Sequence, residues 1–244
     1  MKAPDISVVM TFHRVGRLAH SSIEAAHAAI SYAEHKGLRV EFIFTLDRPD
    51  TETEDICKSY LCEGTRMFEV DYGSVALTRN FGAERAEAAY LAHIDSDDLF
   101  SENWLYSAYV QAAKASTPSV FHPEATIHFE GTKLLTKAIE SDDLEYLKER
   151  MWEGALWGPH TFASREIYIQ YKFPDLKIEE GFGYEDWHWT CETLAAGVKH
   201  VIVPDTLLCY RAKTWKTSLY MDLLSQNVVL GRTSLYNLAF QEAK

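Results

Sequence analysis

An apolar run that ends abruptly in carboxylates constrains this chain more than any other feature. Residues 90–94 read Tyr-Leu-Ala-His-Ile, the pattern of a buried strand, and Asp95-Ser96-Asp97-Asp98 follows directly. In an open α/β sheet, ligands bind in the crevice at the carboxyl ends of the strands. Because alternate side chains of an extended segment point the same way, we expect Asp95 and Asp97 to project together into that crevice.

Two hard oxygen ligands on one side suit Mg²⁺ or Mn²⁺, which completes its coordination with waters and substrate phosphates. In the alternative interpretation, the carboxylates only end a strand, and Asp98 or Ser101 caps the next helix. The cluster by itself favours neither interpretation. The rest of the chain favours the metal site.

Strand and helix patterns alternate over the first hundred residues. Strands are predicted at 6–10, 40–46, 66–70 and 90–94, and helices at 17–35, 51–61 and 75–89. This alternation is typical of βαβ units and predicts a largely parallel sheet.

The pattern is looser after residue 100. Helices are predicted at 103–115, 141–150 and 185–196, strands at 120–122, 126–129, 201–203 and 207–210, and a helical tail at 218–243. Leucines in this tail predict either a face for a homo-oligomer or a larger assembly, or a cover for the core.

Composition excludes several classes of protein. The chain has 244 residues, a formal net charge of −12 and 47% hydrophobic residues. Long nucleic acids are therefore not expected as partners, because phosphate binding needs clustered Lys and Arg. The four cysteines form no C-x-x-C pair and match no zinc spacing, so we expect free thiols in a reducing compartment.

The sequence also predicts where the protein works. No apolar run reaches the ~18 residues of a membrane span, and the N-terminus does not resemble a signal peptide. We expect a cytoplasmic protein, with peripheral association at the inner face of the membrane left open.

Four short motifs along the chain serve as landmarks. They are the first strand with the loop Thr11-Phe12-His13-Arg14, the Arg79-Asn80 pair followed by Gly82, the Asp95–Asp98 run, and Glu185-Asp186 at a helix start with Tyr210-Arg211 downstream. Together they resemble the family-2 glycosyltransferases of the GT-A fold, from about residue 6 to 211. The Q-x-x-R-W pattern of processive synthases is absent, which indicates an enzyme that adds one sugar at a time.

The resemblance implies an α/β fold of the GT-A type, a Rossmann-like and mostly parallel sheet flanked by helices, with a smaller acceptor-side subregion. Residues 1–110 would form the nucleotide-sugar half. Residues 111–215 would form the acceptor and catalytic-base half, and 216–244 a C-terminal helical tail of the same compact domain.

The activity implied is inverting transfer of a sugar from a nucleotide-diphosphate sugar, preferably a UDP-sugar, to a hydroxyl of a glycan or lipid-linked acceptor. Bacterial surface polysaccharide synthesis is the expected setting. Two alternatives stay open: a catalytically impaired binding or scaffold domain, and a nucleotidyltransferase. The second usually has a Gly-rich loop after the first strand, whereas residues 11–17 contain one glycine.

On the donor side, the resemblance places a divalent metal on Asp97, with Asp95 near the metal's waters or the ribose. Thr11, His13 and Arg14 would contact the base and ribose. Asp47 suits the same contact, or instead forms a turn before Pro49. Arg79 would reach the diphosphate, or brace the loop through a salt bridge to Asp71 or Asp95.

On the acceptor side, Asp186 matches the family's catalytic base, with Glu185 beside it. The alternative for both is negative charge that complements a helix dipole. Trp157, Tyr184 and Trp187 are candidates for stacking on a sugar ring, and their alternative is a place in the core.

The sequence departs from the family at one point. Many relatives carry a His shortly after the Tyr-Arg pair, but residues 212–216 read Ala-Lys-Thr-Trp-Lys. Lys213 or Lys216 is expected to meet the diphosphate as a point charge. His160 is the nearest unassigned polar candidate, with a structural role as its alternative.

Overall fold

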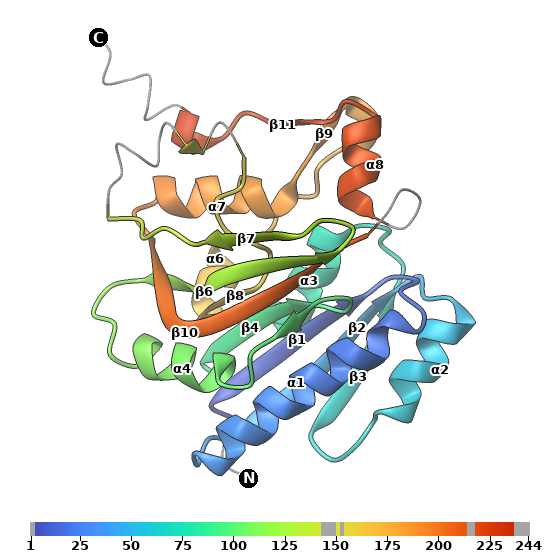
Figure 1. Ribbon diagram of the computed structural model, residues 1–244, viewed down its shortest axis with the longest axis vertical. Helices are drawn as coiled ribbons and strands as arrows, with labels where there is room; N and C mark the ends of the chain where they lie inside the picture. Colours follow the sequence, from blue (N-terminus) through green and yellow to red (C-terminus); the bar gives the residue numbers. More distant parts are fainter. Residues whose placement is uncertain (1–2, 143–149, 152–153, 214–217, 237–244) are drawn as a thin grey trace.

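The computed structural model describes residues 3–142, 150–151, 154–213 and 218–236. They form a nine-stranded mixed sheet in the order β3-β2-β1-β4-β8-β6-β10-β5, with β7 paired to β6 outside this path (Figure 1). A second sheet contains only β9 and β11 among the described residues.

The first half is parallel, as predicted. Its strands are β1 (Ile6–Phe12), β2 (Val40–Asp47), β3 (Thr65–Val70) and β4 (Tyr90–Asp95), and its helices are α1 (Leu18–His35), α2 (Thr51–Ser59) and α3 (Val75–Arg85). β1 pairs in parallel with both β2 and β4, and its seven residues are all buried. The carboxyl ends of β1, β2 and β4 therefore meet at one edge of the sheet.

The second half completes the sheet with antiparallel neighbours. Its elements are β5 (Leu99–Phe100), α4 (Trp104–Ala112), β6 (Ser119–Glu130), β7 (Leu134–Lys137), β8 (Thr161–Ser164), α6 (Arg165–Gln170), the 3₁₀ turn η1 (Ile178–Glu180), β9 (Phe182–Gly183), α7 (Glu185–Ala195), β10 (Lys199–Ala212), α8 (Leu219–Ser225) and β11 (Val229–Leu230). β8 lies antiparallel between β4 and β6, whereas β10 runs parallel to β6.

Helices cover both faces of the sheet. One core cluster joins α1, α2 and α4 to residues such as Val8 and Met10 of β1. The other joins α3, α6 and α7 to Val9 and to Leu91 of β4, whose side chains point the opposite way. Asp95 lies four residues after Leu91 in β4, and alternate residues of a strand point to the same face. The Asp95 side chain therefore lies on the face covered by α3 and α7. No helix in the described part of the chain is long and apolar enough to cross a membrane.

Some element boundaries differ from the prediction. The helix predicted at 75–89 ends at Arg85, because the next N–H groups bond to neighbouring strands: Glu87 donates to the Glu41 carboxylate at 2.6 Å and Ala88 to the Ser7 hydroxyl at 3.0 Å. The strands predicted at 120–122 and 126–129 are continuous in β6. Those at 201–203 and 207–210 are continuous in β10, with an irregularity in the pairing after Val203.

The tail predicted as helical at 218–243 is helical only in part, and residues 229–230 form a strand instead. α8 ends at Ser225, Asn227 adopts a left-handed φ of 55°, and Val229 pairs with Phe182 of β9. Residues 143–149 of the helix predicted at 141–150, and residues 237–243 of the tail, lie outside the described residues. The short strands β5, β7 and β8 carried no pattern that predicted them.

Gly82 lets α3 approach the sheet closely enough to position its polar face. A Cβ at this position would lie 2.3 Å from Val9 Cγ1, in the interior of β1. Gly82→Ala should therefore destabilise the protein by about 1–3 kcal/mol, although alanine is the better helix former. Chemical denaturation measures the change. Gly154→Ala is the control, because a Cβ added there would have no atom within 4 Å; equal stability of both variants would contradict the packing argument.

Candidate active site

A buried guanidinium connects the two halves of the molecule. Arg79 of α3 is 3% exposed, and it donates to Asp95 Oδ1 at 2.8 Å and to Glu185 Oε1 at 2.7 Å. The first carboxylate ends β4, and the second begins α7. Burial opposes the charge on Arg79, but the two carboxylates outweigh it and raise the pKa of the guanidinium. Burial would also raise the pKa of Asp95, yet the attraction of Arg79 lowers it overall.

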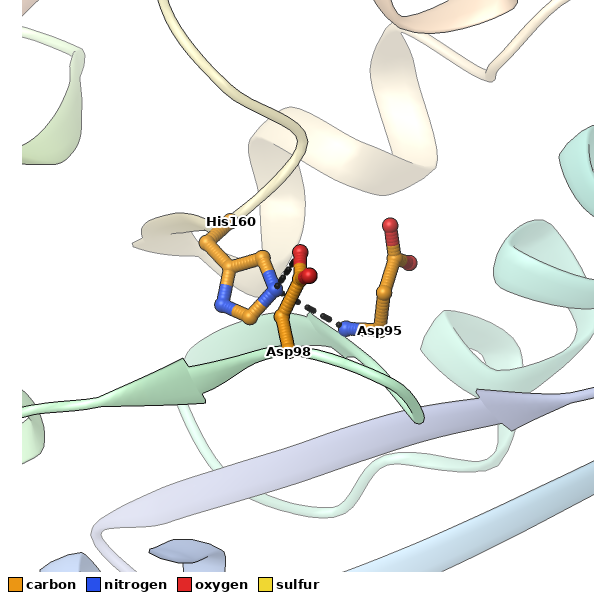
Figure 2. A group of neighbouring side chains, drawn as sticks. All are labelled: Asp95, Asp98 and His160. Atoms are coloured by element: carbon orange, nitrogen blue, oxygen red, sulfur yellow. Dashed lines mark hydrogen bonds and ion pairs between the residues drawn. The ribbon is translucent and has the colours of Figure 1, made fainter. Parts of the chain in front are cut away.

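The imidazole of His160 contacts the run Asp95–Asp98, which we call the acidic turn, at two points. Figure 2 shows His160 beside the Asp98 carboxylate, with Nε2 3.3 Å from Oδ2, whereas the dashed line to Asp95 reaches its backbone nitrogen and not its carboxylate. The backbone N–H of Asp95 lies 3.2 Å from the same Nε2. Both His160 and Asp98 are almost fully buried, and burial raises the pKa of Asp98 to about 6.

Asp98 does not cap a helix. Its Oδ1 accepts a hydrogen bond from the Arg211 backbone N–H at 2.7 Å, and α4 begins after Asn103 with no side-chain cap. The Ser101 hydroxyl accepts from the N–H of Leu207. The capping alternative for Asp98 and Ser101 is therefore wrong, because both residues attach the acidic turn and its continuation to β10.

Asp97 is bound by the end of β10. Lys213 Nζ forms an ion pair with Asp97 Oδ2, and Arg211 Nε donates to the Asp97 carbonyl at 2.7 Å. The same guanidinium pairs with Glu130 and reaches the Ser21 hydroxyl. Arg211 thus holds the backbone of the turn, while Lys213 pairs with its Asp97 carboxylate.

The candidate base stands at the start of α7. Burial of the Asp186 carboxyl, together with the neighbouring Glu185 charge, raises its pKa to about 7, although Arg79 opposes the shift. Its Oδ1 accepts a hydrogen bond from the N–H of Trp187 at 2.8 Å. Before the helix, Tyr184 adopts a left-handed φ of 64°, which non-glycine residues rarely do and which costs about 1–3 kcal/mol. This turn brings Glu185 against Arg79.

The predicted base and ribose contacts gather at the ends of β1 and β2. Thr11 is a register partner of Asp95. His13 Nδ1 lies 2.6 Å from the Asp47 carbonyl, and Arg14 Nε donates to the carbonyl of Arg48 at 3.3 Å.

Asp47 and Arg79 already have structural partners. The Asp47 carboxylate accepts the N–H groups of residues 72–74 at 2.9–3.0 Å, so it organises the loop before α3 and not a turn at Pro49. Of the two salt bridges considered for Arg79, the one to Asp95 is present, whereas Asp71 pairs with Arg48.

The three candidate stacking residues differ in exposure. Trp157 is 5% exposed, stacks on His122 and His200, and donates its indole N–H to the Ile139 carbonyl, so it packs in the core. Tyr184 and Trp187 are partly exposed and meet edge to face at 5.9 Å.

The donor set at the acidic turn fits a divalent ion. Asp95, Asp98 and His160 each offer one ligand atom, and these atoms lie within 4.8 Å of one another. The contacts of Asp95 with Arg79 and of Asp97 with Lys213 each use one carboxylate oxygen, which leaves Asp95 Oδ2 and Asp97 Oδ1 for a ligand. Carboxylate oxygens are ligands that suit Mg²⁺ or Mn²⁺.

Comparison with known families assigns the chain to one of them. The family model described as glycosyl transferase family 2 matches residues 7–173, more than half of the chain. The chain belongs to glycosyltransferase family 2. The family resemblance is thereby confirmed; the matched range contains the first three landmarks, whereas Glu185-Asp186 and Tyr210-Arg211 lie beyond it.

Solved structures confirm the fold of this family-2 glycosyltransferase. TarS from S. aureus, residues 1–349, in complex with UDP-GlcNAc, superposes with a TM-score of 0.68 at 14% identity, covering 87% of this chain and 60% of that one. The same TarS fragment with UDP gives 0.65 at 14% identity, covering 86% and 61%. The chain therefore spans about 60% of the TarS fragment. A search of curated protein sequences finds no match.

Sequence reasoning missed two features of this candidate site. It used Tyr210-Arg211 as a landmark without a role, yet Arg211 anchors the acidic turn. It also left His160 unassigned and did not pair it with Asp98. The sequence did contain a signal for the role of Arg211, because an Arg directly after an apolar strand is unusual unless its charge is paired.

The raised pKa of Asp186 predicts a pH-dependent cost to stability. The folded protein holds the Asp186 proton up to about pH 7, whereas the unfolded chain releases it near 3.8, so stability falls as the pH rises from about 4 to 7. Asp186→Asn should remove this loss. The difference in unfolding free energy between the variant and the wild type should therefore shift in favour of the variant by about 1–2 kcal/mol from pH 5 to pH 8.

Denaturant unfolding at the two pH values measures the effect. Asp55→Asn on α2, an exposed carboxylate, is the control and should show no such difference. An Asp186→Asn variant whose stability follows that of the wild type at both pH values would contradict the raised pKa.

Proposed function

We propose that this chain transfers a sugar from a UDP-sugar to a hydroxyl of a glycan or lipid-linked acceptor, with inversion at the anomeric carbon. The observation that carries the proposal is the Arg79 bridge, which joins Asp95 of the acidic turn to Glu185, the neighbour of Asp186, a carboxyl with a pKa of about 7. Such an arrangement supplies a base and a charged donor site side by side.

The donor would lie along the carboxyl ends of β1, β2 and β4. Thr11, His13, Arg14 and Asp47 are proposed to contact the base and ribose. The complexes of TarS with UDP-GlcNAc and UDP support a uridine nucleotide. Arg79 is buried and holds Asp95 and Glu185, so we assign it a positioning role and not a direct contact with the diphosphate.

The diphosphate would lie at the acidic turn, where negative charge develops as the glycosidic bond breaks. Asp97 and Asp95 would hold Mn²⁺ or Mg²⁺ there, which supplies Lewis-acid stabilisation of the leaving group. Asp98 and His160 would keep the turn in place behind these ligands.

The acceptor would approach from the α7 side. Asp186 would accept the proton of the attacking hydroxyl, since near neutral pH a large fraction of a group with a pKa of about 7 is ionised. Tyr184 and Trp187 flank the helix start and are proposed to contact the acceptor sugar. We place the reaction at the cytoplasmic side of surface polysaccharide synthesis, following the family resemblance.

Removal of the base should separate binding from chemistry. Asp186→Asn should lower turnover about 10²–10⁴-fold while nucleotide binding is retained, because the amide cannot accept the proton. Release of UDP from UDP-GlcNAc and from other UDP-sugars measures turnover, and thermal shift with UDP and Mn²⁺ measures binding. Asp55→Asn controls for loss of a carboxylate elsewhere.

The pH profile of kcat should rise through about pH 7, because only ionised Asp186 accepts the proton. The scaffold alternative predicts instead that the wild type binds nucleotide and releases no UDP from any sugar donor. That result, or a pH profile that is flat from pH 5 to 8, would contradict the proposed function.

A further inference from the structure

Lys213 occupies the carboxylate that the proposed reaction needs for a metal ion. Its ammonium forms an ion pair with Asp97 Oδ2, and the two side chains are 23% and 17% exposed. Surface lysines of this protein are far more open; Lys137 is 76% exposed. The Lys213 ammonium is therefore a cation enclosed in the site, and not one of the chain's surface charges.

The backbone that carries Lys213 is anchored to the acidic turn. Two residues earlier, the Arg211 N–H donates to Asp98 Oδ1 and its Nε donates to the Asp97 carbonyl, both at 2.7 Å. This double anchor keeps the lysine next to the turn. Its four-carbon stem still allows the ammonium to exchange one nearby oxygen for another.

The other cations that touch the turn have several fixed partners. Arg79 is divided between Asp95 and Glu185, and Arg211 binds Glu130, the Asp97 carbonyl and Ser21. Within the part of the chain that the structure describes, the Lys213 ammonium pairs with Asp97 alone. An ammonium has three N–H donors, so this one can take further anionic oxygens.

An ammonium and a divalent ion compete at one carboxylate. Although Asp97 Oδ1 remains open, an ion bound there would lie a few ångströms from the Lys213 ammonium on Oδ2, and two positive charges at that distance repel in a partly buried site. A diphosphate carries more negative charge than one carboxylate and offers several oxygens, so it would draw the ammonium away from Asp97.

We propose that the Lys213 ammonium and a divalent ion compete for Asp97, and that the diphosphate of the donor ends this competition by taking the ammonium onto its own oxygens. The metal then binds weakly to the free protein and tightly once a nucleotide diphosphate is present. The metal part depends on the acidic turn alone, whereas the diphosphate part rests on the proposed function.

Mn²⁺ binding tests the competition without any turnover. Free Mn²⁺ is measured by electron paramagnetic resonance with wild type, Lys213→Gln and Lys199→Gln. The last variant is a matched control, because Lys199 pairs with Asp142 at the other end of β10. Without nucleotide, Lys213→Gln should bind Mn²⁺ at least about tenfold more tightly than the wild type, and Lys199→Gln should not differ from it.

UDP tests the exchange. UDP should tighten Mn²⁺ binding at least about tenfold in the wild type and much less in Lys213→Gln, where no ammonium has to leave. In EDTA, UDP should bind Lys213→Gln about tenfold more weakly than the wild type, and Lys213→Arg should restore part of this affinity. In the double variant Lys213→Gln with Asp97→Asn, the gain in Mn²⁺ affinity should disappear.

The outcomes separate the two proposals. Equal Mn²⁺ affinity of wild type and folded Lys213→Gln would overturn the competition, whatever UDP does. Tight Mn²⁺ binding by Lys213→Gln that persists without the Asp97 carboxylate would also overturn it. A wild type that binds no UDP, with Mn²⁺ or with EDTA, would overturn the proposed function, while the comparison of Mn²⁺ affinities still decides whether Lys213 and the metal compete.

Discussion

The site depends on one buried guanidinium shared between two carboxylates. A charge removed from water is costly unless it is paired and hydrogen-bonded, so Arg79 is compatible with the core only while Asp95 and Glu185 both face it. This requirement fixes the end of β4 relative to the start of α7, which are ninety residues apart in the chain. The Phe173 ring lies 5.4 Å from the guanidinium and closes the remaining side.

The same charge sets the protonation of its neighbours. His93 lies on the same face of β4 as Asp95, packed between Tyr168 and Phe173, and burial together with Arg79 lowers its pKa to about 3. Its imidazole is therefore neutral and belongs to the core. Arg79 does not cancel the effect of burial on Asp186, whose pKa stays near 7. One cation thus keeps Asp95 ionised and leaves Asp186 able to exchange a proton near neutral pH.

A second connection comes from the end of β10. Arg211 binds the backbone and a carboxylate of the acidic turn, while His160, just before β8, supports Asp98 from behind. Strands from both halves of the sheet therefore converge on four residues. Asp95, Asp97 and Lys213 complete the charged groups at this turn, and the donor would bind there.

The alternation of strands and helices was sufficient to predict the parallel half of the sheet, because its buried runs are separated by regular amphipathic helices. It was insufficient where a partner from elsewhere decides the backbone. Glu41 and Ser7 end α3 early, and β9 draws residues 229–230 out of a helix. The landmark residues were recognisable because their order along the chain is distinctive. Their partners were not, since the contacts of Asp98 with His160 and of Arg79 with Glu185 join distant segments.

A crystal structure with UDP and Mn²⁺ tests the account most directly. It should show the diphosphate at the acidic turn, Mn²⁺ on Asp97, the Lys213 ammonium on phosphate oxygens, and the uracil towards Thr11 and Asp47. Asp186 should face the side of the diphosphate on which the sugar would be attached. A nucleotide bound elsewhere on the molecule, or at the turn with Asp186 remote from the diphosphate, would contradict the central claim that these carboxylates form one sugar-transfer site.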